Sequence, residues 1–228
     1  MDVDSLPPQL QFLWRALSSA LHNREPAIRQ RVERLRADNP HLGPDELAKV
    51  LLSHTRRRVS ATGALSGATA FVPGLGTVLA LGAVTGQALY ALEQEAELVL
   101  AIGIIYGHEL AGSDARLLEA LVVIGLAGGG VKLRDDVLVV GGQQVTVAAF
   151  RRLPEAFMAR TGGHVVARIL GRLATTRAAR SAVRVAPLAA GLAAGAGFDW
   201  LAVTTLGRAA MRYYGPGGPA ARRVAAVH

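Results

Sequence analysis

Residues 59–92 read VSATGALSGATAFVPGLGTVLALGAVTGQALYAL and contain no charged side chain over 34 residues. Pro73 and its flanking glycines divide this run into apolar pieces of 14 residues (59–72) and 16 residues (77–92). A helix that spans a bilayer needs about 20 apolar residues, so each piece is too short to cross alone. Two interpretations stay open: a helical hairpin that dips into a membrane, and a buried helical hairpin in a water-soluble fold.

Helical periodicity and helix-end signals surround this run. Gly43-Pro44-Asp45-Glu46 is a favourable helix start, because proline suits the first turn and the acids face the positive end of the helix dipole. We expect this helix to run into Ala70, and the next to run from Thr77 to Tyr106 and end at Gly107 as a left-handed cap. Helical patterns also cover 8–38 (as two polar helices broken near Glu25-Pro26), 113 to the glycines at 128–130, 148–160, 164–185 and 187–214.

The hydrophobic period changes from helical to alternating between residues 131 and 147. Short apolar runs at 131–133, 137–140 and 144–147 are separated by charged residues and by Gly141-Gly142, which is typical of a β-hairpin or a three-stranded meander. The sequence therefore predicts an all-α fold, a Gly/Ala-rich helical bundle with a small β insertion at about 131–147. The expected division is into polar N-terminal helices (1–42), a helical core (43–215) and a flexible tail (216–228).

Small side chains are expected to set the helix packing. The chain is 51% hydrophobic but only 5% aromatic, so its apolar mass is mostly Ala, Leu, Val and Gly. Glycines recur at the four-residue spacing that lets two helix backbones approach closely, in the pairs Gly63/Gly67, Gly82/Gly86 and Gly191/Gly195. This spacing is an association motif in lipid and ordinary tight packing in a soluble bundle, and both interpretations make these glycines helix-packing positions.

The net charge of +8 is unevenly distributed along the chain. Residues 1–136 hold 13 basic and 15 acidic side chains, whereas residues 137–228 hold 12 arginines and 2 acids. An anionic partner is therefore expected for the C-terminal part. Arginines interleave with apolar residues in a basic amphipathic helix that would bind an anionic surface, at Arg160, Arg168, Arg172, Arg177, Arg180 and Arg184. A solvated helix flanking the core is the alternative. Nucleic acid is not favoured, since residues 159–185 contain no aromatic side chain to stack on a base.

Three acids are candidates for a polar site. Glu93 and Glu97 lie one helical turn apart on the same face, a spacing that suits a divalent ion, acid–base chemistry or an ion pair with arginine. Asp199 lies in an otherwise uncharged stretch, where a buried carboxylate must be paired, hydrogen-bonded or protonated. No further metal ligand is available on the helix of Glu93, and no motif for a cofactor occurs, so we expect neither a metal nor a cofactor. The absence of cysteine excludes disulfides and a thiol nucleophile.

Two stretches resemble a known family. GALSGATAFVPGLGTVLALGAVTGQALYALEQEAELVLAIGIIYGHEL, and later RVAPLAAGLAAGAGFDWLAVTTLGRAAMRYYGP, are similar to the EcsC family and related actinobacterial conserved proteins. The resemblance covers roughly residues 43–215. It implies an α-helical, membrane-associated protein and carries no catalytic residues, because the family has no established activity. That family often has a small polar residue, such as Asn, near the position of Asp199.

These features predict a non-enzymatic accessory protein bound peripherally or shallowly to the cytoplasmic face of a membrane. The first ten residues are acidic, contain two prolines and do not read as a secretory signal, which favours the cytoplasmic side. One alternative is a soluble helical module whose basic face binds an acidic protein, and a homo-oligomer is compatible with either. A second alternative is an enzyme on a lipid or apolar substrate that uses Asp199 or the pair Glu93 and Glu97.

Overall fold

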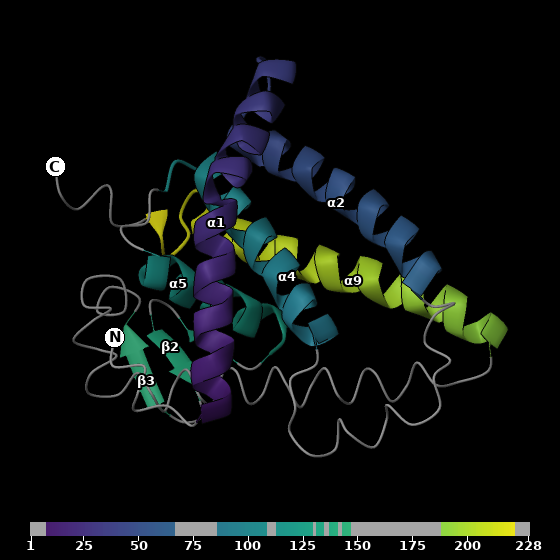
Figure 1. Ribbon diagram of the computed structural model, residues 1–228. Helices are drawn as coiled ribbons and strands as arrows, with labels where there is room; N and C mark the ends of the chain where they lie inside the picture. Colours follow the sequence, from purple (N-terminus) through teal and green to yellow (C-terminus); the bar gives the residue numbers. More distant parts are fainter. Residues whose placement is uncertain are drawn as a thin grey trace, which may run out of the picture.

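The computed structural model describes residues 8–66, 86–108, 113–129, 131–134, 137–140, 143–146 and 188–221. Its elements are α1 (Pro8–Asp38), α2 (Pro44–Ser66), α4 (Gly86–Ile105), α5 (Ser113–Ala127), β1 (Val131–Arg134), β2 (Val137–Val140), β3 (Gln143–Thr146) and α9 (Leu188–Tyr214). Within these residues the protein is mostly helical and carries one small antiparallel sheet (Figure 1). The predicted all-α fold with a β insertion is confirmed.

Helix α4 lies at the centre of the bundle. Every side chain from Leu98 to Ile102 is buried, which is expected of a helix that is covered on all sides rather than amphipathic. The covering elements are α1, α2, α5 and α9. Helix α9 packs most extensively against α2 and also contacts α4 and α5 (Figure 1). The C-terminal helix therefore joins elements from both halves of the chain.

Helix α1 is continuous through Pro26, so the prediction of two helices broken near Glu25-Pro26 is wrong. An interior proline costs about 3 kcal/mol, because it removes a backbone donor and crowds the preceding turn. The helix buries one apolar stripe on both sides of the proline, made of Trp14, Leu17, Leu21, Ile28, Val32 and Leu35. Each such side chain contributes about 1.5–3 kcal/mol on burial, so packing outweighs the local cost.

The predicted starts and ends of the neighbouring helices are confirmed where the structure describes them. At the start of α2, the Leu47 N–H donates to the Gly43 carbonyl at 2.9 Å, and Glu46 Oε2 accepts from the Gly43 N–H at 3.2 Å. This arrangement satisfies backbone groups that a helix start leaves free. At the end of α4, Gly107 adopts a φ of 78°, the left-handed conformation expected of a C-terminal cap.

The β insertion is a meander with strand order β1-β2-β3, both pairs antiparallel. Val131 of β1 and Leu138 of β2 are buried, so one face of the sheet joins the helical core. Gly125 of α5 permits this approach, because a Cβ there would lie 2.5 Å from Cγ2 of Val131.

The chain after α9 differs from the predicted tail without core contacts. Gly218 and Ala220 are buried, and the Ala220 N–H donates to the Tyr213 carbonyl at 3.1 Å. A Cβ at Gly218 would lie 2.4 Å from the Arg212 carbonyl oxygen, so only glycine allows the chain to fold back this closely. Residues 216–221 thus contact the helical core, and residues 222–228 lie outside the described part of the chain.

Both ends of the uncharged run lie in described helices. Helix α2 contains residues 59–66 and α4 contains residues 86–92, with Leu92 buried in the core. None of the described helices combines the length and apolar content needed to cross a membrane. The predicted break at Pro73, the predicted helix start at Thr77 and the helices predicted over 148–185 lie outside the described residues.

Candidate functional site

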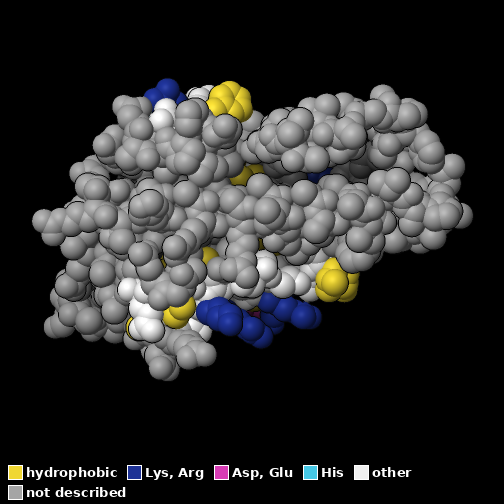
Figure 2. Space-filling model, turned by 90° about the horizontal axis from the view of Figure 1, so that it is seen from below, with side chains coloured by type: hydrophobic (Ala, Val, Ile, Leu, Met, Phe, Trp, Pro, Cys, Tyr) yellow, Lys and Arg dark blue, Asp and Glu magenta, His cyan; other side chains and the backbone are white. Residues whose placement is uncertain are grey.

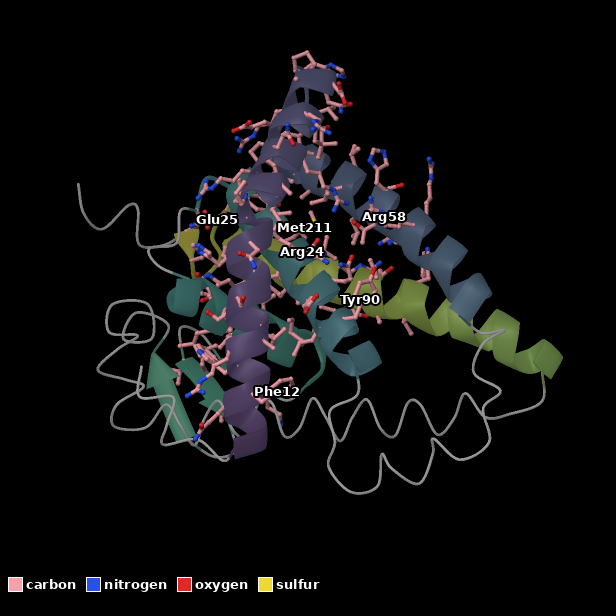
Figure 3. The ribbon with its side chains drawn as sticks, viewed as in Figure 1. Phe12, Arg24, Glu25, Arg58, Tyr90 and Met211 are labelled. Carbon is pink, nitrogen blue, oxygen red and sulfur yellow. The ribbon has the colours of Figure 1, made fainter. Side chains whose placement is uncertain are left out.

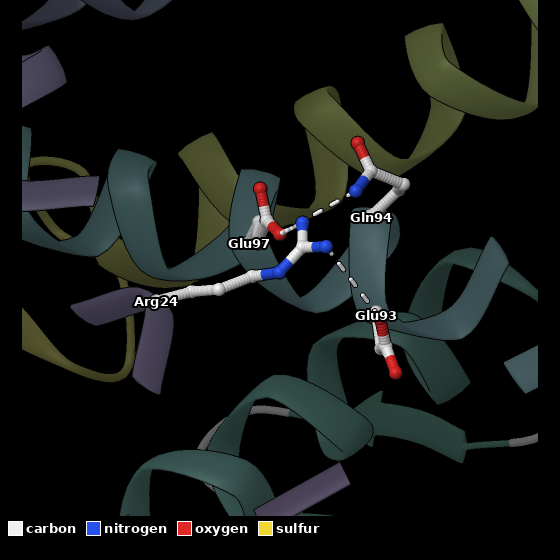
Figure 4. A network of polar contacts seen from close by, with 4 residues as sticks. All are labelled: Arg24, Glu93, Gln94 and Glu97. Carbon is white, nitrogen blue, oxygen red and sulfur yellow. Dashed lines mark hydrogen bonds and ion pairs between the residues drawn. The ribbon is translucent and has the colours of Figure 1, made fainter. Parts of the chain in front are cut away.

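Glu93 and Glu97 of α4 face a single arginine of α1. Arg24 Nη1 donates a hydrogen bond to Glu97 Oε1, and Arg24 Nη2 lies 4.0 Å from Glu93 Oε2 (Figure 4). Gln94 Nε2 donates to the same Glu97 oxygen at 3.4 Å. The helical spacing thus places the two acids on one face of α4, as predicted. Their shared partner is Arg24, a cation from α1.

The electrostatics of this network favour a charged Arg24. The hydrogen bond to Glu97 and the carboxylate charges of Glu97 and Glu93 raise the pKa of Arg24, and burial opposes them only in part. The two glutamate side chains are 15% and 13% exposed, whereas Arg24 is 43% exposed. Among the described residues, no group of three or more side chains could hold a metal ion. The network therefore acts as an ion-pair link between α1 and α4.

Further arginines extend this polar region between α1 and α2. Arg31 Nη2 donates to Thr55 Oγ1 at 3.3 Å, and Thr55 donates in turn to the Leu51 carbonyl at 2.9 Å. Burial, and then the positive charge of Arg58, lower the pKa of Arg31. Arg58 projects from α2 and Tyr90 from the first turns of α4, near the level of Arg24 (Figure 3). Cationic side chains from α1 and α2 thus lie together near the middle of α2.

A second cluster lies where α2 packs against α9. The guanidinium carbon of Arg56 lies 4.9 Å from the ring centroid of Trp200, within the range of a cation–π contact. Trp200 is 46% exposed and the adjacent Leu201 is 54% exposed. We call Arg56, Trp200 and Leu201 the Arg–Trp edge. On the face seen from below, described Lys and Arg side chains lie at two opposite borders, in each case near a hydrophobic side chain (Figure 2).

The sequence did not predict the Arg–Trp edge as a unit. Arg56 and Trp200 lie far apart in the sequence, and no local pattern pairs them. The two residues meet because α2 and α9 pack side by side. Their contact depends on tertiary pairing, which no local pattern records.

Most of the other predicted site residues have side chains outside the described part of the structure. Asp199 lies on α9, but its side chain is outside the described part of the structure, as are all six arginines from Arg160 to Arg184. Of the predicted glycines, Gly67 and Gly82 are outside, and the others lie within helices, at Gly63, Gly86, Gly191 and Gly195. Among the glycines whose surroundings the structure describes, Gly103, Gly125 and Gly207 lie in helices and close to a side chain of another element.

Comparisons of the chain with protein-family models, with curated proteins and with solved structures found no match. The resemblance to the EcsC family therefore stays a prediction. The function has to be argued from the arrangement of the chain's own residues.

Proposed function

We propose that this protein is a non-enzymatic accessory protein that binds the anionic cytoplasmic face of a membrane, peripherally or by shallow insertion. The observation that carries the proposal lies at the two ends of the uncharged run. Arg57 and Arg58 are exposed on α2 directly before it, and Tyr90 is 59% exposed on α4 where it ends (Figure 3). Basic and aromatic side chains thus flank the apolar segment.

This combination suits a membrane surface for physical reasons. Each Lys or Arg near an anionic leaflet contributes about 1 kcal/mol of attraction. Tyrosine is favoured at the interface, because its ring is apolar and its hydroxyl stays hydrated. The 12 arginines of residues 137–228 add further positive charge to the same molecule. Electrostatic attraction then supplies most of the affinity, and apolar contact adds to it.

The pairing of the acids supports a role without catalysis. Glu93 and Glu97 are the described residues considered for acid–base chemistry, and both face Arg24. A carboxylate held by an arginine is a poor general base, because the ion pair stabilises its charged form. The pair is better suited to fixing α4 against α1, which positions Tyr90 at the edge of the bundle.

Cell fractionation tests the proposal. The untagged protein is expressed, membranes are separated from cytosol, and the membranes are washed with high salt and then with alkaline carbonate. Release by salt indicates electrostatic binding, since screening weakens exposed charge contacts, and resistance to both washes indicates insertion. Recovery of the protein in the cytosol from the start contradicts membrane binding and favours the soluble module that binds an acidic protein.

Purified components give the residue-level test. Sedimentation is measured with vesicles of phosphatidylcholine alone or mixed equally with phosphatidylglycerol. The variant Arg57→Gln/Arg58→Gln is expected to bind the anionic vesicles about 30-fold more weakly, because two attractive charges are lost. The matched control is Arg34→Gln/Lys49→Gln, which removes two exposed charges at positions away from the uncharged run. Equal losses in both variants would mean that net charge alone, and not this surface, determines binding.

A further inference from the structure

The Arg–Trp edge has a composition unlike the rest of the described surface. Four large hydrophobic side chains are well exposed among the described residues, and two of them, Trp200 and Leu201, are neighbours on α9. The other two are Phe12 and Tyr90, on α1 and α4. Exposed apolar side chains that stand together mark contact surfaces more reliably than single ones.

Arg56 contacts an aromatic ring at this edge. Its guanidinium lies over Trp200, and its Nε is buried without a hydrogen-bond partner in the described part of the protein. In the same part of the chain, no carboxylate forms an ion pair with Arg56. The contact with the ring orients the guanidinium of Arg56 along this edge.

We infer that the Arg–Trp edge is an interfacial anchor, in which Trp200 and Leu201 enter the headgroup region of an anionic phospholipid bilayer and Arg56 contacts a lipid phosphate. The inference rests on the proposed membrane association and names the residues that make the contact. Tryptophan is suited to this depth, because its ring is apolar and its indole N–H needs a polar partner. Arginine binds phosphate through its forked N–H groups and stacks on aromatic rings at the same time.

Charge and area favour a bilayer as the occupant. The basic run that includes Arg56, Arg57 and Arg58 complements an anionic surface. A stable protein–protein interface buries about 800 Å² on each partner, far more than two half-exposed side chains offer. An interfacial anchor needs only such a small apolar contact, because long-range attraction to the charged leaflet acts with it.

Tryptophan fluorescence tests the anchor directly. The chain has two tryptophans, Trp14, which is 2% exposed, and Trp200. The variant Trp14→Phe leaves Trp200 as the sole reporter, and Trp200→Phe leaves the buried one. With vesicles of phosphatidylcholine and phosphatidylglycerol in equal parts, we expect a blue shift of Trp200, protection from acrylamide, and quenching by lipids brominated near the headgroup. Trp14 should change little. If Trp14→Phe does not fold, the difference between the wild type and Trp200→Phe supplies the same signal.

An affinity measurement provides the matched control. We expect Trp200→Ser/Leu201→Ser to weaken binding to these vesicles about 10-fold or more, because the apolar contact is lost. Phe12→Ser removes a side chain that is 65% exposed near the start of α1, and it should leave the affinity within about 2-fold of the wild type. Figure 3 shows Phe12 on the part of α1 away from Arg58.

The outcomes separate the anchor from the proposed function. If the protein binds anionic vesicles while the Trp200 signal and the Trp200→Ser/Leu201→Ser affinity stay unchanged, membrane association stands and the anchor is wrong. If no variant binds any vesicle, both are wrong. A Trp200 response to poly-glutamate with none to vesicles assigns the edge to an acidic polypeptide and overturns the lipid anchor.

Discussion

Gly207 of α9 lies directly against Leu52 of α2: a Cβ at position 207 would lie 2.5 Å from Cδ1 of Leu52. The missing side chain lets the two helices approach closely. Arg56 follows Leu52 by one helical turn, and Trp200 precedes Gly207 by about two turns, so the two helices run in opposite directions. The contact between Gly207 and Leu52 therefore sets the register in which Arg56 meets Trp200.

Substitution of Gly207 should destabilise the protein through this contact. Gly207→Ala gains about 1 kcal/mol of helix propensity, whereas overpacking of a core costs about 1–3 kcal/mol. We expect a net loss in the free energy of unfolding, because Leu52 is buried and its displacement would disturb the close-packed core. Urea denaturation followed by circular dichroism measures this loss.

Gly207→Ala should have the opposite effect on stability when Leu52 is replaced by a smaller side chain. In a Leu52→Ala background the clash is removed, so Gly207→Ala should stabilise the protein by about 1 kcal/mol through helix propensity alone. A destabilisation of equal size in both backgrounds would show that the contact with Leu52 is not the cause.

Proline at position 26 gives a prediction for α1. Pro26 is exposed within a continuous helix, so it costs stability without contributing to the core. Pro26→Ala should raise the free energy of unfolding by about 1–3 kcal/mol, because the backbone hydrogen bond is restored and the steric conflict disappears. Ala27→Gly at the next exposed position is the control, with an expected loss of about 1 kcal/mol. A loss of stability in Pro26→Ala would mean that the proline is needed for the path of α1.

The sequence predicts those parts of the fold that local chemistry determines. The start of α2 after Gly43 and the end of α4 at Gly107 depend on the backbone groups of adjacent residues, and both are where the sequence predicts them. The path of α1 through Pro26 and the burial of Ala220 depend on contacts with distant elements. A pattern read one segment at a time cannot weigh such contacts against a local signal.

The same division applies to the candidate site. Four-residue spacing predicts that Glu93 and Glu97 share a face, but only the packing of α1 on α4 reveals Arg24 as their partner. The four-residue spacing of glycines predicts positions where helices can approach closely. Gly207, where α9 approaches α2, has no glycine four residues before or after it. Close approach depends on which residue the partner helix presents, and a single helix does not contain that information.

The ion pair between α1 and α4 should contribute modestly and measurably to stability. A double-mutant cycle with Arg24→Gln and Glu97→Gln is expected to give a coupling energy of about 1 kcal/mol, because Glu97 is mostly buried while Arg24 stays partly hydrated. High salt should reduce the coupling by screening. The quantities to measure are the unfolding free energies of the four proteins in urea, at low and high salt.

A local ion pair on the same helix is the matched comparison. Arg29 Nε donates to Glu25 Oε1 at 3.0 Å across one turn of α1. Pairs of this kind are worth about 0.3–0.5 kcal/mol. The cycle for Arg24 and Glu97 should exceed the cycle for Glu25 and Arg29, and the reverse order would argue against the link between α1 and α4.

Alkaline pH should weaken the contact between the end of α4 and the start of α2. The Tyr106 hydroxyl donates to Asp45 Oδ1 at 2.6 Å, and burial, followed by this hydrogen bond and the carboxylate charge, raises the pKa of Tyr106 well above its usual value of 10.0. The folded protein then keeps a proton that the unfolded chain releases, so this stabilisation is complete below about pH 10 and is lost as the pH rises toward the folded-state pKa.

Tyr106→Phe has no proton to lose at this position. From about pH 8 to about pH 11, the unfolding free energy in urea should therefore fall more steeply for the wild type than for Tyr106→Phe. Parallel curves for the two proteins would show that the hydroxyl of Tyr106 does not couple folding to alkaline pH.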